Sequence, residues 1–152
     1  MIRHYQPDDL RGCAEVFRDA FAEEPWKENW SIQLAETRIS ELMNTPLSVG
    51  FVYEEDGAVI GIAAGRGVTY LHGREYVIDE FCVSPKAQGR GIGSEMLRHI
   101  MNEMRAKGFV SVVLQTTKGF PSERFYLKNG FVQSPDMITM YHMLNGFAKR
   151  GV

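Results

Sequence analysis

Three glycines fall within five positions of the chain, at Gly89, Gly91 and Gly93, inside the sequence PKAQGRGIGSEML of residues 85–97. Glycine loses more backbone entropy on folding than any other residue, so this cluster predicts that something approaches the backbone closely. A tight turn, a buried crossing or a phosphate group would each require it. The apolar residues that follow have helical spacing, and the amides of a helix's first turn favour an anion. The loop is therefore a candidate phosphate site, with a turn that binds no ligand as the alternative.

The spacing of these glycines excludes two familiar nucleotide motifs. A nucleoside-triphosphate P-loop requires Gly-Lys at a fixed distance, and neither Gly89 nor Gly91 is followed by it. The dinucleotide pattern G-x-G-x-x-G fails as well, because Ser94 and Met96 stand where its third glycine would be. The phosphate, if one binds, belongs to a different class of ligand.

Two neighbouring carboxylates, Asp79 and Glu80, interrupt the apolar sequence VIDEFCV of residues 77–83. Side chains alternate along a strand, so we expect Asp79 on the face opposite Glu80 unless a bulge exchanges the two. A carboxylate in such a place is a candidate general base. A salt bridge to a neighbouring arginine, Arg66 or Arg74, is the alternative explanation for either residue.

The elements around these residues follow from hydrophobic periodicity and from turn and cap residues. Asp56-Gly57 predicts one hairpin turn, and the sequence HGR at residues 72–74 predicts a second. A strand, helix, strand order around the glycine loop predicts a parallel crossover into a strand buried on both faces. Helices are expected over residues 8–22, 31–44, 91–107 and 121–129, strands over 2–5, 49–55, 58–70, 75–83, 109–117, 131–134 and 137–144, and a loose tail over 145–152. The predicted class is mixed α+β with a central sheet.

Composition narrows the class of protein further. A length of 152 residues suits one domain, and the net charge of −2 argues against a nucleic-acid surface. The N-terminal sequence MIRHYQPDDL has no apolar core of a signal peptide, and the longest apolar stretch, AVIGIAAG, is far too short to span a bilayer. We therefore expect a soluble, cytoplasmic protein without a membrane partner. Cys13 and Cys82 lack metal-ligand spacing and partner histidines, so no metal is expected and both read as small buried apolar residues.

Two motifs in the right order of elements carry a resemblance to a known family. Residues 88–93, QGRGIG, match the signature Q/R-x-x-G-x-G/A, and residues 126–131, YLKNGF, match the ending Y-x-K-x-G-F. The chain thereby resembles the GNAT superfamily of acyl-CoA-dependent N-acetyltransferases over nearly its whole length. This resemblance implies a single domain over residues 1–152, with a mostly antiparallel sheet splayed between strands 4 and 5 and about four flanking helices.

The resemblance also implies how acetyl-CoA, the expected co-substrate, is held. Its pyrophosphate would lie on the loop amides, and its pantetheine arm would pair with the backbone at the end of the strand over 75–83. Many relatives carry an asparagine seven residues before the final tyrosine, where this chain has Gly119, so Thr116 or Thr117 would replace that contact. The implied cofactor-binding residues are Phe81, Cys82, Val83, Gln88, Gly89, Arg90, Gly91, Ile92, Gly93, Ser94, Thr116 and Thr117.

Acetyl transfer from a thioester to an amine needs a base, an oxyanion donor and an acid. Glu80 lies eight residues before Gln88, where several relatives carry an acidic residue, so the resemblance implies that it is the base, with Asp79 as the alternative. Tyr126 occupies the tyrosine position of the second motif and is the implied acid. The backbone N–H of Phe81 or Cys82 is the expected oxyanion donor.

The segment EPWKENW places Trp26 and Trp30 where the family lines its acceptor cleft, beside the acidic residues Glu23, Glu24 and Glu28. An aromatic and acidic surface suits a small cationic amine, and we take Trp26, Trp30 and Glu24 as candidate substrate-binding residues. Core packing is the alternative for both tryptophans. A coenzyme A-binding regulatory module without turnover and a protein or peptide acetyltransferase are the competing functions, and the sequence leaves a homodimer open.

Overall fold

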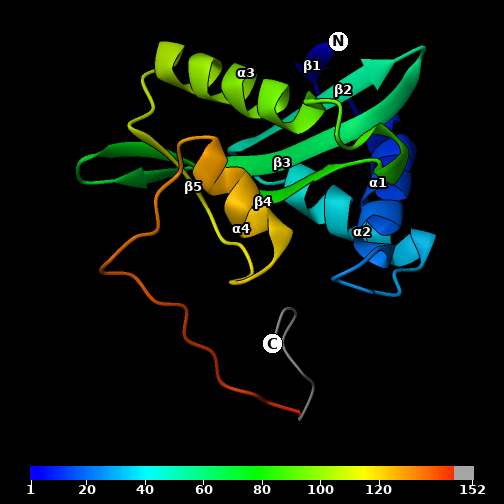
Figure 1. Cartoon of the computed structure of the whole chain (residues 1–152). Coiled ribbons are helices and arrows are strands. Elements are labelled where there is room, and N and C mark those ends of the chain that lie inside the picture. The colour runs from blue at the N-terminus through cyan, green and yellow to red at the C-terminus, as the bar shows by residue number, and fades with distance from the viewer. Residues whose placement is uncertain (146–152) are drawn as a thin grey trace. The chain divides into compact units, whose positions relative to one another are not determined.

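The structure, a computed structural model, describes residues 1–145, which fall into two compact units divided between Gln115 and Thr116. The first unit contains every strand of the described chain and all helices but the last (Figure 1). The strands are β1 (Ile2–His4), β2 (Ser48–Glu55), β3 (Ala58–Tyr70), β4 (Gly73–Val83) and β5 (Ser111–Leu114). The helices are η1 (Pro7–Asp9), α1 (Leu10–Ala22), α2 (Ile32–Met43), η2 (Pro85–Ala87), α3 (Ile92–Ala106) and, in the second unit, α4 (Pro121–Lys128).

The five strands form one sheet in the order β1-β2-β3-β4-β5, in which only β4 and β5 are parallel. This confirms the predicted mixed class with a mostly antiparallel sheet. Asp56 and Gly57 both have positive φ in the turn between β2 and β3, as the hairpin prediction requires. The second turn lies at residues 71–72, one position earlier than expected.

Helices cover both faces of the sheet (Figure 1). On one face, α1 and α2 pack on β2, β3 and β4 through a buried cluster that includes Phe17, Ile39, Ile62 and Cys82. Ser31 begins α2 as predicted, because its side chain accepts a hydrogen bond from the amide of Leu34. On the other face lies α3, whose buried side chains alternate with its exposed ones at helical spacing.

The parallel ladder between β4 and β5 is short. It joins Glu75–Ile78 of β4 to Ser111–Leu114 of β5, while β4 continues to Val83 along β3. The two strands therefore diverge beyond Ile78, which agrees with the predicted splay between strands 4 and 5. Strand β5 is shorter than the predicted range, and Val113 is 38% exposed, so the expectation of burial on both faces is wrong.

The second unit contains α4, which begins at the predicted proline and is followed by Asn129 and Gly130 with φ of +87°. The two strands predicted over 131–134 and 137–144 are wrong, because these residues form no regular element. Ile138 and Met140 remain 80% and 82% exposed. A strand needs a neighbour for its backbone hydrogen bonds, and this unit, as far as residue 145, contains no other strand. The predicted tail over 145–152 lies, after Asn145, outside the described residues.

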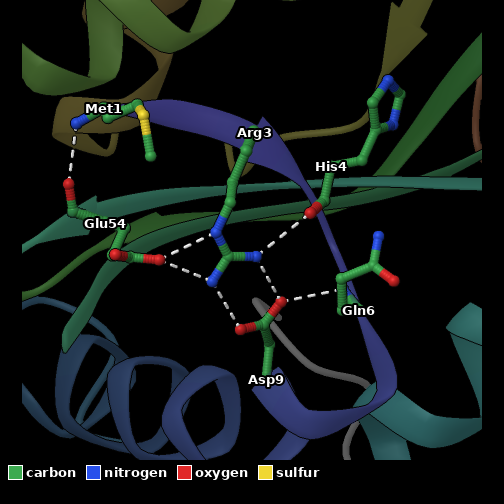
Figure 2. A network of polar contacts seen from close by, with 6 residues as sticks. All are labelled: Met1, Arg3, His4, Gln6, Asp9 and Glu54. Atoms are coloured by element: carbon green, nitrogen blue, oxygen red, sulfur yellow. Dashed lines mark hydrogen bonds and ion pairs between the residues drawn. The ribbon is translucent and has the colours of Figure 1, made fainter. Parts of the chain in front are cut away.

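An ion-pair network joins β1, η1 and β2 at the start of the chain (Figure 2). The Nη1 and Nη2 atoms of Arg3 lie 2.7 Å and 2.8 Å from the two carboxylate oxygens of Asp9, and its Nε donates to Glu54 at 2.8 Å. Asp9 also accepts a hydrogen bond from the amide of Gln6 and is 9% exposed. The hydrogen bonds from Arg3 lower the pKa of the Asp9 carboxyl.

We expect Asp9→Asn to lower the free energy of unfolding by about 1–3 kcal/mol at neutral pH, because it leaves the partly buried Arg3 without its bidentate partner. A carboxyl whose pKa is lowered on folding stabilises the fold at every pH above its pKa in the unfolded chain, near 3.8. This contribution is lost as the pH falls below that value. The difference from wild type should therefore shrink below about pH 4. Urea titrations at several pH values measure it. Asp8→Asn, at the exposed neighbouring position, should have no such effect.

Candidate active site

The ladder between β3 and β4 is interrupted by a β-bulge at Asp79. Ala64 of β3 lies opposite Glu80, and the next residue, Gly65, lies opposite Ile78, so Asp79 is the extra residue of β4. A bulge re-aims the side chains of the strand that carries it. The regular alternation that placed Asp79 and Glu80 on opposite faces therefore does not hold at this point.

The bulge changes the face to which β4 directs its buried side chains. Before it, Tyr76 packs edge-on against Phe51, which in turn contacts His99 of α3. After it, Cys82 belongs to the buried cluster under α1 and α2. Glu80 lies two residues before Cys82 and so shares the face of α1 and α2.

Glu80 is 4% exposed and is paired with an arginine other than Arg66 and Arg74, the two expected from the sequence. The Nε and Nη2 atoms of Arg38, on α2, lie 3.2 Å and 3.1 Å from its Oε1. Burial of a carboxylate is costly unless a charge and hydrogen bonds compensate for it, and this guanidinium provides both. The sequence does not reveal this pairing, because Arg38 is 42 residues from Glu80 and lies in an amphipathic helix, where a charged residue on the polar face is common.

Asp79 pairs with Arg66, whose Nε lies 3.2 Å from its Oδ2. Arg66 lies two residues beyond Ala64 on β3 and therefore shares its face of the sheet. The salt bridge that the sequence offered as an alternative role for this carboxylate is present. The bulge thus brings two carboxylates and two arginines to the α2 side of the sheet, beside the end of the ladder with β5.

The glycine loop has the backbone that its composition predicted. Gly89 and Gly91 have φ of +76° and +82°, and a Cβ added at either would meet nothing within 4 Å. Gly91 is the N-cap of α3 and supplies no side-chain capping bond to the amides of the first turn. Those amides have no partner within a helix, so an anion placed before Ile92, Gly93 and Ser94 would satisfy them.

Two side chains of the loop have partners elsewhere in the first unit. The Nε2 atom of Gln88 donates to the carbonyl of Val83 at 3.0 Å, which ties the loop to the end of β4. Arg90 pairs with Glu55 at 2.6 Å and 3.0 Å, and its hydrogen bonds lower the pKa of that carboxyl. Both partners lie at the surface, so Arg90 can exchange Glu55 for a phosphate at little cost.

The remaining predicted cofactor-binding residues of the first unit lie at the end of β4. Phe81, Cys82 and Val83 continue the strand past the last rung of the ladder with β5. Cys82 and Val83 are buried, and Cys82 is a free cysteine, as expected for a small apolar residue. An extended arm that added to this strand would do so beside Glu80.

Tyr126, Thr116 and Thr117 belong to the second unit. Tyr126 lies on α4, where its ring packs edge-on against Phe125 and Phe131 at 5.2 Å and 5.6 Å between centroids. The hydroxyl of Thr116 donates to that of Ser122 at 2.8 Å. The structure places these residues with respect to their own unit, and their proposed roles rest on the motif.

The tryptophans of the candidate acceptor segment pack on the core. Trp26 contacts Phe21 edge-on, and Trp30 contacts Phe17 in the same manner. The indole N–H of Trp30 donates to Glu28 at 2.6 Å. Core packing, the alternative given for these residues, is thus part of their role, and Glu24 pairs with Lys27 at the surface.

The chemistry of these residues fits acetyl-CoA. The open, positive-φ glycines leave room for a pyrophosphate at the start of α3, and the end of β4 offers a strand for an extended arm. Among residues 1–145, no group of three or more His, Cys, Asp and Glu side chains is arranged to hold a metal ion. None of the helices in that range combines the length and apolar character needed to cross a membrane.

Comparison with known proteins agrees with this geometry. The sequence model of the acetyltransferase (GNAT) family matches residues 11–131. A mycothiol acetyltransferase of Thermomonospora curvata is 28% identical over 134 residues, which cover 87% of this chain. The matched stretch spans 44% of that relative, so the chain accounts for less than half of its length.

Solved structures share the fold. A predicted acetyltransferase of Clostridium acetobutylicum with acetyl-CoA superposes with a TM-score of 0.73 at 19% identity, covering 93% of this chain and 95% of the other. An aminoglycoside acetyltransferase from an uncultured soil metagenomic sample, in complex with sisomicin, has a TM-score of 0.74 at 16% identity, covering 95% and 96%. At sequence identities this low, the two structures show only that this chain has the same fold.

Proposed function

The chain belongs to the acetyltransferase (GNAT) family, and from this premise we propose that it transfers the acetyl group of acetyl-CoA to a primary amine of a small molecule. The observation that carries the proposal is the buried Glu80 on β4, because the end of this strand is tied through Gln88 to a glycine loop suited to the co-substrate. The C. acetobutylicum structure with acetyl-CoA supports the choice of donor.

The proposed reaction is a direct attack. The amine nitrogen forms a bond to the thioester carbonyl carbon and gives its proton to Glu80, directly or through water. The carbon–sulfur bond then breaks, and the departing thiolate takes a proton from the phenol of Tyr126. Asp79 is the alternative base, because the bulge places it beside Glu80 with its own arginine partner.

The acceptor is proposed to be a small molecule with a cationic amine. The acidic residues Glu23, Glu24 and Glu28, which stand near Trp26 and Trp30 in the sequence, support this proposal. The sisomicin complex of one structural neighbour and the name of the mycothiol relative are consistent with small acceptors in this family. The two tryptophans, whose rings pack on the core, would then contact the acceptor with the parts of the rings that face away from Phe17 and Phe21.

A panel of amines tests the proposal by free-thiol release from acetyl-CoA, with mass spectrometry of the acetylated product. We expect turnover with at least one class of small amine. Binding of acetyl-CoA without turnover on any amine would instead support a regulatory module. Activity confined to peptides would support a protein acetyltransferase.

Tyr126→Phe is expected to lower kcat about 10-fold or more while acetyl-CoA binding changes little. The phenol acts on the sulfur as the carbon–sulfur bond breaks, so its effect is larger in the transition state than in the ground state. Steady-state kinetics and calorimetry measure the two quantities. An acyl donor with a more acidic leaving thiol serves as the control, because its thiolate needs a proton less. Equal impairment with both donors would show that Tyr126 is not the acid.

A further inference from the structure

The carboxylate proposed as the base, that of Glu80, forms an ion pair with Arg38 in this structure. Arg38 directs both Nε and Nη2 at a single oxygen of Glu80, and the carboxylate is almost completely buried. Within residues 1–145, the other terminal nitrogen of Arg38, Nη1, forms no hydrogen bond, and the side chain is 36% exposed. The guanidinium therefore has one side on Glu80 and another available to a ligand.

An amine that reaches Glu80 must come close to this guanidinium. An ammonium close to Arg38 would be repelled by its like charge, and this repulsion is stronger near a protein surface than in bulk water. A purely cationic acceptor would thus bring a second positive charge beside the ion pair of Arg38 and Glu80. An acceptor that brings a negative charge of its own would keep the balance.

Proton transfer strengthens this argument. When Glu80 takes the proton of the attacking amine, it becomes neutral, and Arg38 loses the counter-charge that it has in the resting structure. A partly buried guanidinium without a partner is costly. A carboxylate on the acceptor would remain paired with Arg38 while Glu80 is protonated, because arginine binds carboxylates with two parallel hydrogen bonds.

A second arginine lies on the same face. Arg66 follows Ala64 by two residues, about 7 Å along β3, and Ala64 is the residue opposite Glu80. Arg66 contacts Asp79 through Nε, and its terminal nitrogens form no hydrogen bond within residues 1–145. The α2 side of the sheet thus presents two arginines that each retain donors for an anion.

We propose that the acceptor is a zwitterionic amine, with a carboxylate on the carbon next to the amine as in an α-amino acid, and that Arg38 binds this carboxylate. The inference rests on the proposed acetyl transfer and specifies its substrate class. The ammonium approaches Glu80 as the carboxylate pairs with Arg38, so that each charge of the acceptor meets an opposite charge of the site. Arg66 is the less favoured candidate for binding this carboxylate, because its own partner, Asp79, is more exposed than Glu80.

The test compares three forms of each acceptor: an L-α-amino acid, its carboxamide and its decarboxylated amine. The carboxamide has a less basic amine than the acid and the decarboxylated form has a more basic one, so a preference for the acid over both does not come from basicity. We expect kcat/KM to be about 10- to 100-fold higher for the acid, the usual value of a hydrogen bond between charged groups.

Arg38→Met should remove this preference, lowering kcat/KM for the acids while the decarboxylated amines lose less or gain. Arg38→Lys retains the charge and should keep part of the preference, and Arg18→Met, at a surface pair with Asp19, should keep all of it. Calorimetry with acetyl-CoA verifies that each variant is folded. Turnover without preference for the acid, or a preference that survives in Arg38→Met, overturns the inference alone. Absence of turnover with every amine, despite acetyl-CoA binding, overturns the proposed function as well.

Discussion

Glu80→Gln is expected to lower kcat/KM for acetyl transfer by about 10²- to 10⁴-fold, the contribution of a positioned proton acceptor. Glutamine has the shape of glutamate, and its carbonyl still accepts from Arg38, so the buried contact between α2 and β4 is retained. What is lost is the capacity to take a proton from the attacking amine. Steady-state kinetics at saturating acetyl-CoA measure the effect.

The pH dependence separates a base from a binding residue. As the pH approaches the amine's own pKa, more of the acceptor reaches the enzyme already deprotonated, so the loss in Glu80→Gln should shrink. Asp79→Asn is the matched control, because Asp79 is the neighbouring carboxylate on the same bulge and pairs with Arg66. An equal loss in both variants, constant with pH, would assign Glu80 to binding. A larger loss in Asp79→Asn would identify Asp79 as the base.

The parts of the fold that the sequence predicted are those fixed by local chemistry. Asp56-Gly57 forms a turn because both residues have positive φ, and Ser31 begins a helix because its hydroxyl accepts from an amide three residues later. Gly91 ends the loop in the left-handed conformation for the same local reason. Each depends on atoms within a few positions of the chain.

The parts that escaped prediction depend on contacts between distant segments. The bulge at Asp79 was open as an alternative, but whether it forms depends on the register of β3 on β4. Arg38 reaches Glu80 only because α2 packs on that face of the sheet. The apolar sequence over 137–144 has the composition of a strand, but composition does not supply a partner for its backbone.

The glycine loop gives the second large expected effect: Gly91→Glu should raise the Kd for acetyl-CoA by about 100-fold or more. Juxtaposed like charges cost several kcal/mol, and each 1.4 kcal/mol is a factor of ten in affinity. A side chain at Gly91 enters open space at the start of α3, so its carboxylate would stand where the pyrophosphate is proposed to bind. Calorimetry with acetyl-CoA measures the loss.

Backbone strain is the competing explanation, because Gly91 has φ of +82° and a non-glycine residue in this region costs roughly 1–2 kcal/mol. Gly91→Gln is therefore the matched control: it has the same length and the same strain but no charge. If the loop binds the pyrophosphate, the glutamine variant should lose far less affinity than the glutamate variant, and added salt should narrow the gap between them. Equal affinities in the two folded variants would mean that no anion lies at the start of α3. The three glycines would then be explained by the turn alone.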